Sequence, residues 1–147
     1  DGKLCLCDWQ IEKRRAGIDK RLQGVLQAPY EVRASEVITK AVTQLDEYFA
    51  RERTTFDIPL LFIGTDFQKR VWSELLKIPY GTTLSYAGLS AGLNNPKAIR
   101  AVAGANGANP ISIFVPCHRV IGSNHELTGY GGGLTAKKFL LELESMK

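Results

Sequence analysis

The chain has 147 residues, of which 44% are apolar, and a formal net charge of +4. This length is enough for one domain or for two small ones that share an interface, and the composition is that of a globular protein with a buried core. No apolar run approaches the roughly 20 residues of a membrane span and no secretory signal pattern opens the chain, so we expect an intracellular protein, cytoplasmic or nuclear, with no membrane partner. The mild positive charge permits a nucleic-acid partner but does not require one.

Residues 1–33 are predicted to form a short strand followed by charged, turn-rich sequence. Cys5 and Cys7 alternate along that strand, so both thiols should point to the same face. The chain has three cysteines, and an odd number argues against a disulfide framework. Two thiols without further ligands at suitable spacing do not make a zinc site, so we predict buried strand residues here and no metal.

A helix is predicted over residues 35–51, because Ser35 can cap its N-terminus and apolar residues recur on one face. These residues are Ile38, Val42, Leu45 and Phe49. The apolar stretch 56–63 is interrupted by Pro59, which predicts an irregular linker or an edge strand.

The character of the sequence changes after residue 63, where we place the boundary between an N-terminal subdomain (residues 1–63) and a C-terminal domain (residues 64–147). Thr65 and Gln68 have the spacing of a capping box, which predicts a helix start. A turn follows at residues 79–82.

Two short helices are predicted next. Ser85 can cap the first, which ends at Gly92, and Asn95-Pro96 predicts the start of the second, which runs on to about residues 104–107. Two short helices joined by a tight turn indicate a helix-turn-helix. The second helix is rich in Ala and Gly, which suits either close approach to a nucleic-acid groove or ordinary close packing between helices.

The alternating sequence 111–115 predicts a strand that runs into Pro116-Cys117-His118-Arg119-Val120. A glycine-rich loop follows at residues 129–133, and a final helix is predicted from about Thr135 to Met146.

Cys117 is a candidate nucleophile. Pro116 fixes the backbone before it, and a free thiol with a pKa near 8.5 needs a base or a positive environment to become thiolate. His118 and Arg119 are the local candidates, although neighbouring residues point in different directions, so His118 would act through a water. The alternatives are a buried structural thiol, a core histidine and a surface arginine.

The last helix offers a second clue, because Glu144 shares a face with Lys137, Leu140 and Leu141. If that face packs inward, the carboxylate needs a partner, and an imidazole such as His118 would serve. The alternative is a solvated helix end with a salt bridge.

Taken together, these motifs resemble those of the methylated-DNA–protein-cysteine methyltransferase family (O6-alkylguanine-DNA alkyltransferases). The matching blocks cover about residues 64–144. They are Ile78-Pro79-Tyr80-Gly81, Ser85-Tyr86, Asn95-Pro96-Lys97-Ala98, Arg100-Ala101-Val102, Asn109-Pro110, Pro116-Cys117-His118-Arg119-Val120 and Gly129-Tyr130-Gly131-Gly132. The resemblance implies a mixed α/β (α+β) fold, with a small ribonuclease-H-like N-terminal subdomain and a winged-helix-like C-terminal domain that contains the helix-turn-helix.

The resemblance also implies an activity: direct, stoichiometric transfer of the alkyl group from O6-alkylguanine, and also O4-alkylthymine, in double-stranded DNA to Cys117. His118 would act as the base through a water, Glu144 would orient His118, and Asn109 would complete the hydrogen-bonded chain around the thiol. No cofactor is implied, and we expect a monomer.

On the DNA side, the resemblance implies that Tyr86 crowds the target phosphate and donates to guanine N3, and that Arg100 fills the gap left by the flipped nucleotide. The carbonyls of Cys117 and Val120 would accept from the guanine amino group.

The loop around Tyr130 and Gly131 would wall the pocket and offer a backbone N–H to O6. Gly131 stands where some relatives carry Ser, so only its N–H can serve. Lys97 and Arg119 would contact phosphates or the strand.

Three other functions remain as alternatives. A lesion sensor without transfer activity would lack the acceptor cysteine, and a transcription regulator would need an additional sensor domain. A cysteine hydrolase would need an oxyanion hole and multiple turnover, and it would leave Tyr86 and Arg100 unexplained.

Overall fold

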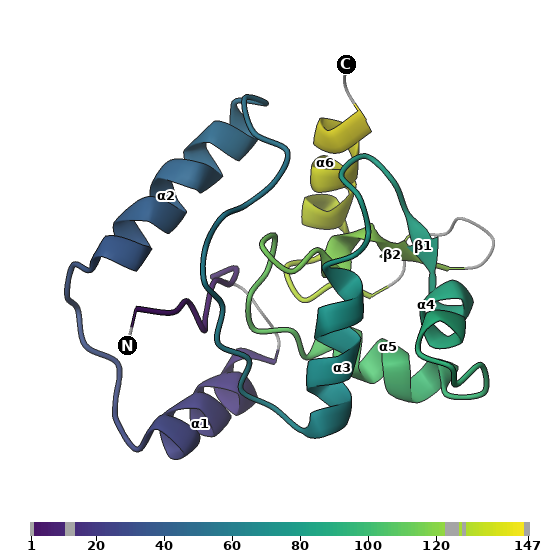
Figure 1. Ribbon diagram of the computed structural model, residues 1–147, viewed down its shortest axis with the longest axis horizontal. Helices are drawn as coiled ribbons and strands as arrows, with labels where there is room; N and C mark the ends of the chain where they lie inside the picture. Colours follow the sequence, from purple (N-terminus) through teal and green to yellow (C-terminus); the bar gives the residue numbers. More distant parts are fainter. Residues whose placement is uncertain (1, 11–13, 123–126, 128, 146–147) are drawn as a thin grey trace.

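The computed structural model describes residues 2–10, 14–122, 127 and 129–145, and within them the fold is mainly helical. Its elements, in chain order, are α1 (Arg15–Leu26), α2 (Glu36–Phe49), α3 (Asp66–Leu75), β1 (Leu84–Ser85), α4 (Tyr86–Gly92), α5 (Ile99–Gly107), the 3-10 helix η1 (Cys117–Arg119), β2 (Val120–Ile121) and α6 (Leu134–Ser145). Figure 1 shows α1 and α2 on one side of the molecule and α3 to α6 on the other. No helix in the described ranges is long and apolar enough to cross a membrane.

Three helix starts agree with the sequence prediction because the capping side chains are in place. Ser35 accepts from the backbone N–H of Ile38, and Ser85 accepts from that of Gly88. Thr65 and Gln68 form the reciprocal capping box at the start of α3. Each cap satisfies N–H groups that the first helical turn leaves without a partner.

The predicted start of α5 at Asn95-Pro96 is wrong by about one turn. Ala98 N–H donates to the Asn95 carbonyl at 3.1 Å, which closes a separate turn, and the helix begins at Ile99 without a side-chain cap. Lys97 therefore lies in this turn rather than on α5. α4 and α5 pack against each other and against α3, which gives the helix-turn-helix arrangement.

The predicted strand 111–115 is also wrong. The regular sheet among the described residues is the parallel pair β1–β2, in which Leu84 pairs with Val120 and Ser85 with Ile121. Residues 111–115 instead make isolated bridges around a tight turn, and all five are buried. The alternating pattern gave a wrong prediction, because Ser112 is buried like its apolar neighbours.

The N-terminal region (residues 1–63) departs most from its prediction. α1 occupies part of the stretch expected to be turns, and its two glycines, Gly17 and Gly24, weaken the helical signal in the sequence. The expected strand is reduced to isolated bridges at Leu4 and Cys7. Cys5 packs on the Ile18–Leu22–Ile63 cluster whereas Cys7 packs on the main core, so the two thiols do not share an environment.

The face of α2 that packs inward is not the apolar face that the sequence pattern indicated. Ile38 and Val42 are 48% and 52% exposed, whereas Tyr48 is fully buried. Ala41 and Gln44 are buried on the same side as Tyr48. The inward face is the one that carries the large aromatic ring and the polar groups that find partners across the interface.

The main core lies in the C-terminal region (residues 64–147), between α3, α4, α5 and the segment 111–120. Trp72 is fully buried there, and its indole N–H donates to the Ala105 carbonyl at 2.9 Å. This bond fixes α3 against α5 and satisfies the one polar atom of the ring.

Candidate active site

Two consecutive γ-turns shape the backbone that leads to Cys117. The first is centred on Ile113, which has φ 73°, and Phe114 N–H donates to the Ser112 carbonyl at 2.9 Å. The second is centred on Pro116, with φ −80° and ψ 61°, and Cys117 N–H donates to the Val115 carbonyl at 2.8 Å. A positive φ at a β-branched residue is strained, and such strain persists only where the surroundings impose it.

Asn109 supplies much of that constraint. Its side-chain N–H donates to the Val115 carbonyl at 2.9 Å, and its side-chain oxygen accepts from Ile111 N–H at 2.9 Å. The amide thus ties together both ends of the strained turn. It also hydrogen-bonds the Cys117 thiol, which favours the thiolate.

His118 and Glu144 are brought together by η1 and α6. His118 Nε2 lies 2.6 Å from Glu144 Oε2, and both side chains are buried. Because a carboxylate accepts, Nε2 carries the proton and Nδ1 is left as an acceptor. Among the described residues, no hydrogen-bond partner reaches Nδ1. Burial lowers the pKa of His118, so the ring is a neutral base at pH 7.

Glu144 is ionised despite its burial. Burial opposes its ionisation, but hydrogen bonds from His118, Arg119 and Tyr48 outweigh this and lower its pKa to about 2. The inward orientation of the last helix is therefore the one that satisfies the carboxylate, rather than the solvated alternative.

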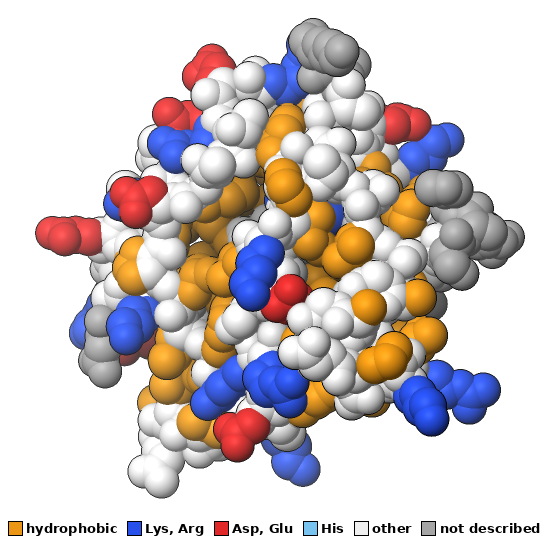
Figure 2. Space-filling model, turned by 45° about the vertical axis from the view of Figure 1, so that its right-hand side comes forward, with side chains coloured by type: hydrophobic (Ala, Val, Ile, Leu, Met, Phe, Trp, Pro, Cys, Tyr) orange, Lys and Arg blue, Asp and Glu red, His pale blue; other side chains and the backbone are white. Residues whose placement is uncertain are grey.

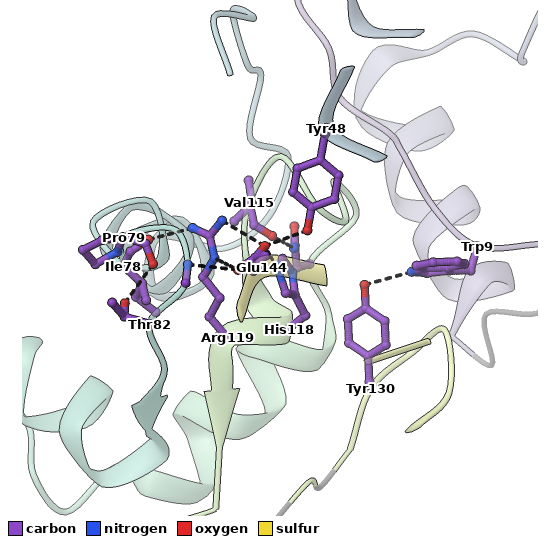
Figure 3. A network of polar contacts seen from close by, with 12 residues as sticks. Trp9, Tyr48, Ile78, Pro79, Thr82, Val115, His118, Arg119, Tyr130 and Glu144 are labelled. Carbon is purple, nitrogen blue, oxygen red and sulfur yellow. Dashed lines mark hydrogen bonds and ion pairs between the residues drawn. The ribbon is translucent and has the colours of Figure 1, made fainter. Parts of the chain in front are cut away.

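Arg119 does not lie where a phosphate contact would. Its side chain is buried, and it donates to Glu144 Oε1 from Nε at 2.8 Å and to the Ile78 carbonyl from Nη1 at 2.7 Å. This corrects the expectation that Arg119 contacts DNA, because its guanidinium is already used inside the protein (Figure 3). Arg119, two residues after Cys117 in the sequence, thus binds Glu144 inside the protein rather than a phosphate.

Cys117 is 4% exposed, and burial raises the pKa of its thiol to about 11. Asn109 and the positive charge of Lys137 act in the opposite direction. Lys137 is fully buried on α6, where Nζ donates to the Val120 carbonyl at 2.6 Å, and burial lowers its pKa to about 8. A cation near the thiol stabilises the thiolate once it forms.

Three side chains of the site were missed from the sequence. Lys137 had a signal, since it shares a helix face with Glu144. The sequence carried no such signal for Tyr48 and Trp9, because both come from the N-terminal region. The Tyr48 hydroxyl donates to Glu144 Oε2 at 2.6 Å, and the Trp9 indole donates to the Tyr130 hydroxyl at 2.8 Å (Figure 3).

The glycine-rich loop is anchored by Trp9. A Cβ at Gly132 would clash with the Trp9 ring, so only glycine allows the loop to pack this closely. The Trp9 and Tyr130 rings meet edge to face at a centroid distance of 6.2 Å. Gly131 lies between these two contacts and is half-buried.

The residues expected to meet DNA differ in exposure. Lys97 and Arg100 are exposed, before and at the start of α5, whereas Tyr86 is half-buried at the first position of α4, with Lys137 Nζ 6.0 Å from its ring centroid. Figure 2 shows one face of the molecule, on which Lys and Arg side chains are scattered rather than gathered in one patch. The fold and the site therefore define a helix-turn-helix protein with a buried cysteine in a polar network.

Residues 66–146 match the family described as "6-O-methylguanine DNA methyltransferase, DNA binding domain", and residues 4–62 match "6-O-methylguanine DNA methyltransferase, ribonuclease-like domain". The chain belongs to the 6-O-methylguanine DNA methyltransferase family. The mixed α/β fold expected from the resemblance, with a ribonuclease-like N-terminal part and a DNA-binding C-terminal part, is confirmed.

Named relatives support the same assignment. The methylated-DNA–protein-cysteine methyltransferase of Mycobacterium tuberculosis is 58% identical over 107 residues, which are 73% of this chain and 65% of the relative. The Methanosarcina acetivorans protein of the same name is 53% identical over 113 residues, 77% of this chain and 72% of the relative. The crystal structure of Mycobacterium tuberculosis OGT in complex with DNA matches with a TM-score of 0.72 at 58% identity, covering 73% of this chain and 66% of that one. The chain spans about two thirds of the length of its mycobacterial relative.

Proposed function

We propose that this protein repairs DNA by transferring the alkyl group of O6-alkylguanine to Cys117, once per molecule, as a methylated-DNA–protein-cysteine methyltransferase. The observation that carries the proposal is the polar network beside the thiol. Glu144 holds the His118 ring through a 2.6 Å contact to Nε2, which leaves Nδ1 free to accept a proton. A neutral, oriented imidazole in the residue after a buried cysteine is what thiolate formation requires.

In the proposed reaction the Cys117 sulfur attacks the alkyl carbon opposite O6, so that the C–S bond forms as the C–O6 bond breaks. The thiol proton passes through a water to His118 and then to the departing guanine. The products are an S-alkylcysteine and unmodified guanine. Since no step cleaves the thioether, each molecule acts once. Asn109 stabilises the thiolate through a hydrogen bond, and Lys137 stabilises it through its positive charge.

Binding requires the base to leave the duplex, because O6 is inaccessible to a protein thiol inside the stack. We assign Arg100 on α5 to the gap that the flipped nucleotide leaves, Lys97 to a phosphate, and Tyr86 to guanine N3. The exposure of Lys97 and Arg100 supports these roles. The partner is double-stranded DNA, and a monomer suffices.

The pocket wall is assigned to the loop that contains Tyr130 and Gly131, with the Gly131 N–H directed to O6. The carbonyls of Cys117 and Val120 accept from the guanine amino group, and Val120 shares its carbonyl with Lys137. O4-alkylthymine is the secondary substrate. We also propose that residues 64–147 form the DNA-binding and acceptor domain, with residues 1–63 as a separate domain packed against it.

The test is intact-mass analysis after incubation with an oligonucleotide that carries one O6-methylguanine. We expect one added methyl group per protein, mapped to Cys117, absent from Cys117→Ser and retained in Cys5→Ser and Cys7→Ser. Binding of the lesion without any mass shift would contradict the proposal and indicate a lesion sensor. Repeated turnover on an ester would indicate a hydrolase.

A further inference from the structure

Glu144 Oε2 accepts hydrogen bonds from both regions of the molecule. His118 Nε2, from the C-terminal region, lies 2.6 Å away, and the Tyr48 hydroxyl, from α2, also lies 2.6 Å away. Figure 3 shows the Tyr48 hydroxyl pointing at Glu144 beside the His118 ring. The same carboxylate oxygen is therefore shared between the proposed base and a tyrosine 96 residues distant in the sequence.

The Tyr48 ring is held in place by its packing. It is fully buried in a cluster with Ile113, Leu140 and Leu143, which come from the strained turn and from α6. Phe56 lies against it at a ring-centroid distance of 5.5 Å. Burial and the hydrogen bond to Glu144 raise the pKa of Tyr48, so its hydroxyl is protonated and remains a donor at pH 7.

We propose that Tyr48 is a positioning residue for the transfer reaction: by donating to Glu144 Oε2, it limits the negative charge that the carboxylate presents to His118 and so keeps the imidazole neutral. A neutral imidazole is the form that can take the thiol proton. The inference rests on the proposed function, and it assigns the N-terminal region a part in the chemistry.

The other groups around His118 and Glu144 cannot play this part. Arg119 carries a fixed charge and donates to Oε1 at 2.8 Å and to Oε2 at 3.1 Å, and Lys137 from α6 acts on both His118 and Cys117 through its positive charge. The Gly81 backbone N–H donates weakly to Oε1 at 3.5 Å. Tyr80 is neutral near pH 7, because burial and the negative charge of Glu144 raise the pKa of its hydroxyl. Of the described side chains, Tyr48 is the neutral donor to the oxygen that His118 uses.

Tyr48→Phe removes the hydroxyl and keeps the ring. Glu144 Oε2 then has one donor fewer, so it becomes a stronger acceptor for His118 and stabilises the imidazolium. We expect the pKa of His118 to rise by about 0.5 to 1 unit, the effect of one hydrogen bond. The matched control is Tyr80→Phe, which removes a second hydroxyl from a ring whose centroid is 6.2 Å from that of Tyr48.

The first measurement is the single-turnover rate of methyl transfer as a function of pH. We expect the acidic limb of the profile to move to higher pH by the same 0.5 to 1 unit in Tyr48→Phe and to stay at the wild-type position in Tyr80→Phe. A rate lowered by one constant factor at every pH would show that Tyr48 has a packing role only and would overturn the proposal.

The second measurement does not depend on activity. The chain has two histidines, so the ¹⁵N and ring N–H resonances of His118 can be assigned with a His125→Gln variant. A stronger bond to Glu144 moves the Nε2–H proton of His118 downfield in Tyr48→Phe. If the wild-type protein transfers no alkyl group, the proposed function fails while this signal still reports on Tyr48. An unchanged resonance, or an equal shift in Tyr80→Phe, would refute the inference.

Discussion

The two regions of the molecule are held together in different ways. Every residue from Asn109 to Ile121 in the C-terminal region is buried. In the N-terminal region the buried residues among those described are few: Leu4, Ile18, Leu22, Ala41, Gln44, Tyr48 and Ile63. The C-terminal region thus supplies most of the main core, whereas the N-terminal region adds Leu4 and Ala41 to it and joins it through backbone hydrogen bonds between Cys7 and residues 110–112. Two of its side chains, Tyr48 and Trp9, end at the proposed active site.

The polar network of the C-terminal region therefore depends in part on hydrogen bonds from Tyr48 and Trp9, which lie outside that region. Substitutions can separate the two contributions. We therefore expect the largest losses of stability where the buried network itself is broken and smaller ones where the N-terminal region contacts that network. We expect almost none at the exposed positions that we propose to face DNA.

Glu144→Gln should have the largest effect. It leaves the buried Arg119 guanidinium without its anion, a change that costs about 3–5 kcal/mol in comparable sites. It also frees the His118 ring, so transfer should be lost. Because the pKa of Glu144 is lowered to about 2, its contribution to stability is present above about pH 4.5 and declines as the pH falls toward 2.

Urea denaturation at several pH values checks this prediction. The difference in unfolding free energy between wild type and Glu144→Gln should shrink as the pH falls from 5 toward 2. A difference that stays constant over this range would show that the carboxylate is not anchored as described.

Asn109→Ala should have the next largest effect. It leaves the Val115 carbonyl and the Ile111 N–H without partners inside the core, at a cost of about 1–3 kcal/mol. Without the amide the strained turn at Ile113 relaxes, and Cys117 loses a thiolate donor, so the transfer rate should fall more than the stability alone explains. Thermal unfolding and single-turnover rates, measured on the same preparation, test both parts. Asn109→Asp, which keeps the acceptor for Ile111, serves as the comparison.

Trp9→Phe tests a contact that the N-terminal region makes with the glycine-rich loop of the C-terminal region. The indole bond to the Tyr130 hydroxyl is lost while most of the ring remains, so we expect a loss of about 1 kcal/mol. The glycine-rich loop should exchange its amide hydrogens faster, which peptide-resolved hydrogen–deuterium exchange over residues 129–133 measures. Tyr30→Phe, at an exposed hydroxyl bonded to Asp19, is the control. Equal exchange in both variants would show that Trp9 does not anchor the loop.

Lys97→Ala should have the smallest effect on folding, within about 0.5 kcal/mol, because its side chain is exposed. It should nevertheless weaken DNA binding and reduce the salt dependence of binding by about one phosphate contact. Lys138→Ala, an exposed lysine on α6, is the matched control and should leave the salt dependence unchanged. An identical salt slope in Lys97→Ala and wild type would remove Lys97 from the DNA-binding surface.

The sequence predicted the C-terminal region better than the N-terminal region for a physical reason. Capping residues such as Ser85 and Thr65 act within one helical turn, so their effect can be identified locally. The contact of Glu144 with His118 was also anticipated, because a carboxylate on an apolar helix face needs a buried partner. Tyr48 could not be found this way, since its partner lies on another element and its own helix shows a more apolar face elsewhere.

Two errors have the same origin. The strand expected at residues 111–115 rested on the alternating sequence alone, but this buried segment turns sharply at Ile113. Arg119 was assigned to DNA because it lies in the motif region, whereas its guanidinium donates to the buried Glu144. In both cases tertiary burial overrode a local pattern.

The burial of the Cys117 thiol has a consequence for the lifetime of the unused protein. Peroxides and other soft oxidants attack the thiolate far faster than the thiol. With its pKa raised to about 11 and 4% of its surface exposed, Cys117 stays protonated and shielded in the resting protein. In the proposed reaction each molecule acts once, so any such side reaction would waste it. The low resting reactivity of Cys117 would thus preserve it for the proposed transfer.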